Sequence, residues 1–418
     1  MKKWIGSILL ILFVQLSFGA YLLVPMDHKQ QNHLKAYGLA YWIIEKGTEV
    51  KWLLNYRGGS FLVPLSEQVR GEASLRGVTT ETLADARANS ILGDIARPDK
   101  NMDAVSMNKA PKIAVYSPPN KQPWDDAVTL VLTYSDIPYD VIYDQEIIDG
   151  KLKEYDWLHL HHEDFTGQFG KFYQNYQHMP WYQEEVRVNK AVATKNGFKK
   201  VSEMKRFVSK QIKGYITQGG FLFAMCAATD TYDIALSAHH TDICESMYDG
   251  DPADHHAQDK LDYKNTLAFR DFKIVKNPLE YEFSDIDVST TRKVRQEQDF
   301  FSLFDFSAKW DPVPTMLTQN HEKLIKGFMG QTTAFKRSLL KPDVLVMGEN
   351  KAAGEARYIH GDLGKGFWTF YGGHDPEDYR HLVGDPPTQL DLHPNSPGYR
   401  LILNNILFPA AKKKKLKT

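Results

Sequence analysis

Short apolar segments alternate with longer amphipathic ones along most of the chain. At the N-terminal side this pattern predicts a strand, a helix, a strand and a helix, at 21–27, 32–47, 50–56 and 79–96. The next segment, 97–110, is polar and aperiodic, which predicts a linker. We therefore expect an N-terminal α/β extension over 21–96 that is connected by this linker to the rest of the chain.

The alternation continues beyond the linker. Strands and helices are predicted in turn, with strands at 111–119, 139–144, 155–164 and 221–226 and helices at 124–136 and 204–220. An irregular insertion near 240–340 is followed by predicted strands at 342–350, 356–362 and 366–374 and a helix at 396–408. Such alternation is typical of a parallel sheet with helices on both faces. We therefore predict a flavodoxin-like α/β domain over 111–408.

The N-terminal segment 1–20 has the features of a secretory signal peptide. Lys2 and Lys3 precede an apolar run that is too short to span a bilayer comfortably, and the small residues Ser17 and Gly19 follow it. This pattern predicts export to the periplasm or the exterior, and an uncleaved anchor is the alternative. The rest of the sequence has no comparably long apolar stretch, so we expect no stable membrane insertion after cleavage.

Charge and aromatic content restrict the partners that we expect. The net charge is −1, which gives no support for a basic nucleic-acid-binding face, and the basic tail 409–418 is typical of a solvated terminus. Aromatic residues make up 12% of the chain, and several lie in polar neighbourhoods around 173–182. Ordinary packing explains them, but they also suit a polar ligand such as a sugar. We predict a small-molecule substrate, and the sequence does not indicate an oligomeric state.

Cys226 ends a predicted buried strand in the stretch GGFLFAMCAATDTYD. A nucleophile at a tight strand-to-helix turn requires small neighbours, and Ala224, Ala227 and Ala228 provide them. The following helix N-terminus would lower the pKa of the thiol and supply an oxyanion donor. The alternatives are an inert core cysteine or a disulfide with Cys244, the second of the two cysteines.

His374 lies after a late apolar strand in the stretch GKGFWTFYGGHDPED. A catalytic histidine needs an acceptor that fixes its tautomer and stabilises the imidazolium. Glu377 is the predicted acceptor, and Asp375 and Asp378 are alternatives. An ordinary loop histidine among solvated acids is the competing interpretation.

A third polar cluster, His161, His162, Glu163 and Asp164, also follows a predicted strand. Ligands of doubly wound sheets bind at the carboxyl ends of the strands, so we predict that this cluster binds substrate on the oxyanion side. His159, His161 and Glu163 alternate along one strand face and could bind zinc or another divalent ion. Because strand-end histidines also line pockets without metal, we predict no metal.

Arg57 precedes two glycines and is a candidate for binding an anionic group of the substrate, with a simple turn as the alternative. The chain has no phosphate-binding loop and no Gly-x-Gly-x-x-Gly motif. We therefore predict no nucleotide and no other cofactor.

The order of these motifs resembles that of the class I glutamine amidotransferase-like superfamily, including its trehalose-utilisation-type branch. The resemblance covers about 111–235 and 340–408. It implies a Cys–His–Glu set in which Cys226 is the nucleophile, His374 the general base and Glu377 the orienting acid. The chain departs from the family pattern because alanine and methionine flank the cysteine in place of glycine, and because the acid follows the histidine by three positions instead of two.

Several stretches, among them HLKAYGLAYWIIEKG, DWLHLHHEDFTGQFGKFY and YGGHDPEDYRH, are similar to a family of exported proteins of Bacteroidetes-type bacteria that is often labelled asparagine synthetase B. Authentic synthetases of that name have a cysteine where Lys2 stands here, and a Ser-Gly-Gly-x-Asp-Ser loop that this chain lacks. The predicted function is therefore a cysteine-dependent amidase or hydrolase acting on a small amide or glycan-derived metabolite. A non-catalytic carbohydrate-binding module on the same fold is the alternative.

Overall fold

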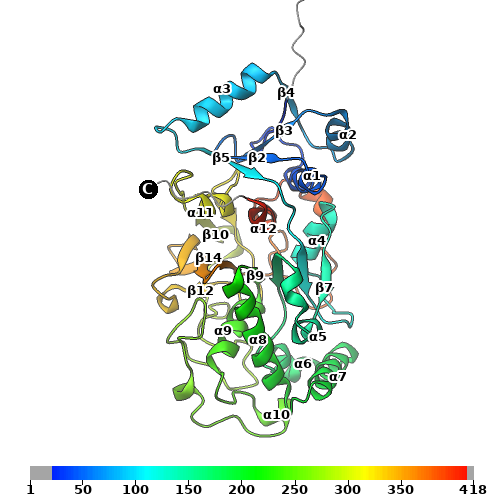
Figure 1. The fold of residues 1–418 in the computed structure, drawn as a ribbon. Helices are drawn as coiled ribbons and strands as arrows, with labels where there is room; N and C mark the ends of the chain where they lie inside the picture. Colours follow the sequence, from blue (N-terminus) through cyan, green and yellow to red (C-terminus); the bar gives the residue numbers. More distant parts are fainter. Residues whose placement is uncertain (1–20, 412–418) are drawn as a thin grey trace, which may run out of the picture.

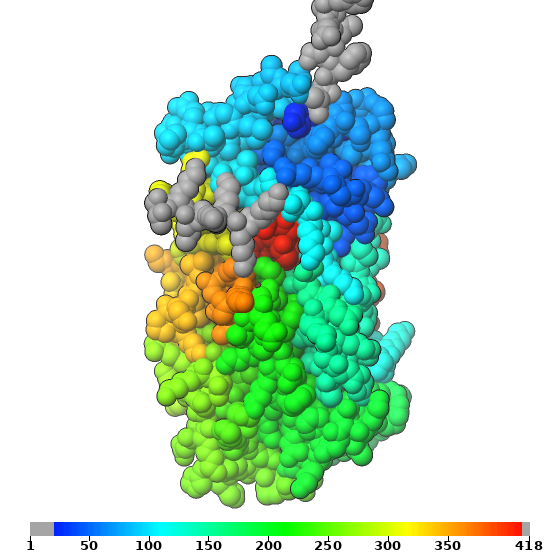
Figure 2. Space-filling view, viewed as in Figure 1, coloured from blue at the N-terminus to red at the C-terminus, as the bar shows by residue number. Residues whose placement is uncertain are grey.

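The computed structural model describes residues 21–411. The predicted signal peptide 1–20 and residues 412–418 of the basic tail therefore lie outside the described residues. The chain forms two sheets, and the N-terminal part caps one end of an elongated molecule (Figures 1 and 2). None of the helices within 21–411 combines the length and the apolar character that crossing a bilayer requires.

The N-terminal unit is a five-stranded sheet of order β4-β1-β3-β2-β5 in which all neighbours are antiparallel. Its elements are β1 (Tyr21–Val24), α1 (His33–Glu45), β2 (Val50–Leu54), β3 (Ser60–Pro64), α2 (Glu67–Leu75), β4 (Glu81–Leu83), α3 (Asp85–Ala96) and β5 (Asp103–Met107). The predicted linker 97–110 thus contains an edge strand that pairs with β2. The sequence did not indicate it because only Val105 and Met107 of β5 are buried.

The second sheet has ten strands, in the order β11-β10-β13-β14-β15-β9-β8-β6-β7, with β12 paired to β14. The strands are β6 (Ile113–Tyr116), β7 (Asp140–Ile142), β8 (Trp157–Leu160), β9 (Phe221–Met225), β10 (Phe300–Leu303), β11 (Leu324–Lys326), β12 (Phe335–Lys336), β13 (Leu345–Asn350), β14 (Glu355–Leu363) and β15 (Gly366–Tyr371). Strands β7, β6, β8, β9 and β15 run parallel, whereas β14, β13, β10 and β11 continue the sheet in antiparallel pairs.

The prediction of a flavodoxin-like parallel sheet with helices on both faces is therefore wrong: one sheet is antiparallel and the other is mixed. Strands β14 and β15 are joined by two residues, 364–365, and β13 is joined to β14 by 351–354. Such connections permit only hairpins, because a parallel crossover needs a dozen or more residues. Apolar runs alone did not reveal this, because a strand buried on both faces has the same pattern in either direction.

The helices of the larger unit are α4 (Ala127–Tyr134), α5 (Asp144–Ile148), α6 (Tyr173–Tyr176), α7 (Pro180–Lys195), α8 (Val201–Gln218), α9 (Ala227–Ser237), α10 (Ser246–Asp249), α11 (Pro312–Leu317) and α12 (Pro397–Leu407). Alternate residues of the central strands enter different cores. Trp157 and Phe223 join the core that contains α4 and α12, whereas Leu158 and Leu222 join the core that contains α8 and α9. Because a slip of one residue would exchange these two sets, the register of the strand ends is firmly fixed.

Candidate functional site

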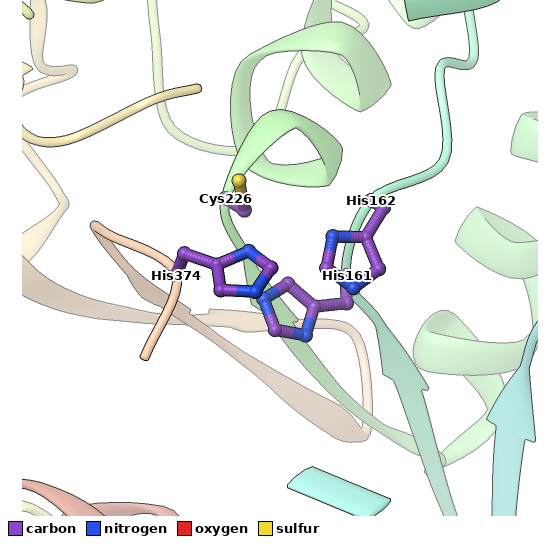
Figure 3. Close-up of side chains that lie close together, drawn as sticks. All are labelled: His161, His162, Cys226 and His374. Carbon is purple, nitrogen blue, oxygen red and sulfur yellow. The ribbon is translucent and has the colours of Figure 1, made fainter. Parts of the chain in front are cut away.

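The sheet register brings three strand ends together. Strand β9 pairs in parallel with β8 and with β15, so that Ala224 lies beside Leu160 and Met225 beside Tyr371. The residues that follow these strands leave the sheet at one edge. Four of the predicted site residues therefore meet there, and Figure 3 shows their side chains gathered together: His161, His162, Cys226 and His374.

Cys226 occupies a sharp turn between β9 and α9. Its backbone φ of 50° and ψ of −140° place a non-glycine residue in a conformation that costs on the order of 1–3 kcal/mol. The turn is held by its N–H, which donates to the Gly373 carbonyl at 3.2 Å, and by the Ala228 N–H, which donates to the His161 carbonyl at 3.0 Å. Strain of this kind concentrates at functional sites, because the surrounding structure must enforce it.

The thiol of Cys226 is buried, with 3% of the residue exposed, and it forms no disulfide. Its sulfur accepts a hydrogen bond from the Gln331 N–H at 3.2 Å. Burial raises the pKa of the Cys226 thiol to about 11, although the backbone amides of Gln331, Thr332 and Ala227 act in the opposite direction. The N-terminus of α9 thus lowers this pKa through the Ala227 N–H, but burial outweighs it, and the predicted net lowering is wrong. The thiol needs a base to release its proton at neutral pH.

His374 is a buried imidazole that stacks on His381, with ring centroids 4.4 Å apart. Its Nε2 atom has no hydrogen-bond partner. Burial, together with the neighbouring histidines 162, 161 and 381, holds the pKa of His374 well below its usual range. The ring is therefore neutral. The electron pair of its unpaired nitrogen can bind a proton transiently, or another electron-pair acceptor.

His381 carries a charge that the sequence did not indicate. Its Nε2 lies 3.1 Å from Asp125 Oδ1, and its Nδ1 lies 2.9 Å from Asp378 Oδ2. Burial opposes the charge, but the two carboxylates raise the pKa of His381 to about 9. The ring beneath His374 is consequently a cation, which further disfavours protonation of His374.

The predicted orienting acid faces elsewhere. Glu377 pairs with His393 (Oε2 to Nδ1, 3.1 Å). Its neighbour Asp375 accepts hydrogen bonds from the Glu377 N–H at 2.8 Å and from the Tyr399 hydroxyl at 2.7 Å. The prediction that Glu377 orients His374 is therefore wrong. The turn after His374 closes back on itself through a backbone bridge between Asp375 and Asp378, and the Asp378 carboxylate pairs with His381.

The segment 161–164 divides between two roles. His161 and His162 lie in the cluster, with their rings stacked 3.9 Å apart. Asp164 instead organises the following loop, because its carboxylate accepts the N–H groups of Thr166 at 2.6 Å and Gln168 at 2.7 Å. Glu163 accepts the His161 N–H at 3.3 Å, and burial together with the nearby Asp126 raises its pKa to about 8. Substrate binding therefore stays a prediction for His161 and His162, which lie in the cluster.

Arg57 does not reach the cluster. Its guanidinium forms ion pairs with Asp27 at 2.7 Å and with Glu81 at 2.9 Å, both in the N-terminal unit. It joins the turn after β2 to residues near β1 and β4. Arg57 therefore stabilises the N-terminal unit, and the prediction that it binds an anionic group of the substrate is wrong.

Asp126 is a site residue that sequence reasoning missed. It caps α4 by accepting the Val128 N–H at 2.7 Å, and its other oxygen lies 3.0 Å from His159 Nε2 and 3.3 Å from His161 Nδ1. Burial alone would raise the pKa of Asp126, but the two histidines hold it well below its usual range. The predicted helix began at 124, two residues before this N-cap, and an aspartate in its first turn was the available signal.

Comparisons with known proteins leave the family open. No family model and no curated protein matches the chain. Among solved structures, one cytoplasmic protein of Salmonella typhimurium is similar at 11% identity and a TM-score of 0.36, and covers 72% of this chain and 100% of its own. A second has 12% identity, a TM-score of 0.35 and the same coverage. A β-galactosidase of Bacillus circulans sp. alkalophilus has 11% identity and a TM-score of 0.28, covering 70% of this chain and 32% of its own.

Proposed function

We propose that the protein is an exported, cysteine-dependent hydrolase that cleaves an amide bond of a small extracytoplasmic metabolite. The observation that carries this proposal is the strained turn at Cys226, which places its thiol at the N-terminus of α9 beside the imidazole of His374. Strand-end nucleophiles with an adjacent base are the arrangement that acyl transfer requires.

The reaction follows from the positions of the two side chains. His374 accepts the thiol proton as the sulfur of Cys226 attacks the substrate carbonyl carbon and forms a carbon–sulfur bond. The resulting imidazolium donates that proton to the departing amine as the carbon–nitrogen bond breaks. Water then hydrolyses the thioester, with His374 again acting as base, and the products are a carboxylic acid and the free thiol.

Charge near the base does not keep His374 protonated between the steps of this cycle. The negative charge of Asp126 favours the imidazolium form of His374, whereas His381 and burial oppose it. The backbone amides of Ala227, Gln331 and Thr332 surround the sulfur and stabilise negative charge there. We therefore expect His374 to act mainly as a transient proton carrier and not as half of a permanent ion pair.

A cluster of aromatic side chains favours a sugar-bearing ligand. Trp124 lies 5.5 Å from His162, ring to ring, and 5.3 Å from both Phe172 and Trp181. The indole nitrogens of both tryptophans are buried without a hydrogen-bond partner. Aromatic faces with a free polar edge suit a polyhydroxylated ring, so carbohydrate binding without catalysis is the second candidate function.

We predict that metal-free wild-type protein releases ammonia from at least one member of a panel of amides that includes sugar-derived amides, and that the Cys226→Ala variant releases none. The small alanine fits a turn already flanked by alanines, so the variant should fold. The measurement is ammonia release, run beside a glycan-binding array on the same preparations. If both proteins bind a sugar equally and neither hydrolyses any amide, the hydrolase proposal is wrong and the carbohydrate-binding function is supported.

A further inference from the structure

The four gathered side chains contain more unsatisfied electron pairs than a cysteine–histidine pair needs. One ligand atom from each of His161, His162, Cys226 and His374 lies within 4.8 Å of all the others. The His161 and His374 residues are 0% and 6% exposed, and the Nε2 atom of each has no hydrogen-bond partner. Buried nitrogens without partners are costly, and they indicate that a group is to be bound there.

We propose that His161, His162, Cys226 and His374 bind a zinc ion. Three imidazoles and one thiolate form a nitrogen–sulfur set of the kind that zinc takes in tetrahedral sites. The usual zinc–ligand lengths require ligand separations of about 3.3–3.8 Å, so the four atoms need to close by no more than roughly 1.5 Å. Side-chain rotation at the ends of three strands is sufficient for this change.

Polar contacts on the far side of two histidine rings already set which nitrogen of each can bind the ion. His161 Nδ1 lies 3.3 Å from Asp126 Oδ2, which leaves its Nε2 as the ligand atom. His162 Nε2 donates to the Asp125 carbonyl at 2.9 Å, which leaves its Nδ1. A histidine whose second nitrogen is held by a carboxylate or a carbonyl is the usual arrangement around protein-bound zinc.

Charge at the cluster is consistent with a divalent cation. Neutral imidazole is the form of histidine that binds a metal ion, and the rings of His162 and His374 lie with their centroids 4.6 Å apart. The carboxylate of Asp126 lies 3.3 Å from His161, and zinc would deprotonate the thiol of Cys226 on binding. The two negative charges of Asp126 and the thiolate then balance the two positive charges of the ion.

Zinc binding has a consequence for catalysis that rests on the proposed hydrolase function. Four protein ligands leave no open position on the ion, so the bound form resembles a structural site more than a catalytic one. Its sulfur would be occupied and unavailable for attack. The zinc-bound protein is then the resting form of the enzyme, and removal of the ion releases the nucleophile.

The test counts metal and requires no turnover, so its outcome is independent of whether the hydrolase proposal holds. Untagged protein is stripped with chelator, equilibrated with Zn²⁺, desalted and assayed for metal. We expect one zinc per chain in the wild type and in the control His393→Gln, which alters a histidine outside the cluster. His162→Gln should weaken the affinity by more than the roughly 10–100-fold that is lost when a group hydrogen-bonded to a metal ligand is removed.

Two further variants separate the roles of the ligands. With Co²⁺ in place of zinc, the wild type should show thiolate-to-metal charge-transfer absorption, and Cys226→Ser should lose it. Asp126→Asn keeps an oxygen to cap α4 and should weaken zinc binding about 10–100-fold. Circular dichroism must match the wild type for each variant. Less than a tenth of an equivalent of zinc in the wild type, binding unchanged in His162→Gln, or a cobalt spectrum without the thiolate band would each overturn the assignment.

Discussion

Replacing His374 by glutamine should lower the rate of amide hydrolysis by about 10³-fold, since positioned general bases contribute on the order of 10²–10⁴-fold. The thiol of Cys226 has a pKa raised to about 11 and therefore depends on an external base at neutral pH. Glutamine fills a similar volume but cannot accept the proton. The measurement is kcat for ammonia release by metal-free protein.

The matched controls for this variant lie on the neighbouring turn. His393→Gln removes a partly exposed histidine whose partner is Glu377, and it should change kcat by less than about two-fold. Glu377→Gln should be equally mild, because its carboxylate pairs with His393 and not with the catalytic ring. A large loss in Glu377→Gln with a normal rate in His374→Gln would reverse the roles assigned to these residues.

The second large effect concerns stability. Asp233→Ala in helix α9 should lower the free energy of unfolding by about 3 kcal/mol or more, because each buried donor left unpaired costs roughly 1–3 kcal/mol. The Asp233 carboxylate is fully buried and accepts three backbone N–H groups of the insertion, from Leu267 at 2.6 Å, Ala268 at 2.7 Å and Phe269 at 2.9 Å. These bonds fasten the insertion to the helix that begins at the Cys226 turn.

Equilibrium unfolding in urea would measure this loss, with Asp259→Ala as the control in the same insertion. Asp259 is exposed and pairs only with the exposed His256, so its removal should stay within about 0.5 kcal/mol. If Asp233→Ala were as stable as Asp259→Ala, the insertion would not depend on this carboxylate.

The sequence located the strand ends well but not the direction of every strand. The segments around Cys226, His374 and His161 were recognised because each follows a short apolar run, and parallel pairing of β8, β9 and β15 then brings them to one edge. The antiparallel half of the larger sheet was missed because a doubly buried strand such as β14 has no alternation from which its environment can be read. The two-residue connection between β14 and β15 was the overlooked evidence for a hairpin.

The electrostatics of the site depend on contacts that sequence spacing does not encode. Glu377 is near His374 in sequence, yet the intervening turn directs it to His393. His381 is seven residues from His374 but stacks directly on it, and Asp125 approaches it from a different strand end. The pKa of Cys226 likewise depends on how deeply the turn is buried, which outweighs the helix N-terminus from which a lowered value was predicted.

The central claim is that Cys226 is a nucleophile activated by His374, and differential alkylation tests it most directly. Metal-free folded protein is treated with iodoacetamide at neutral pH, and modification is followed peptide by peptide. Cys244 is the internal control, because it is also buried and its sulfur donates to the Thr166 carbonyl at 3.1 Å. We predict that Cys226 reacts at least about 10-fold faster than Cys244, and that His374→Gln abolishes this difference. Equal rates for the two cysteines, or no reaction at Cys226 until the protein unfolds, would contradict the claim.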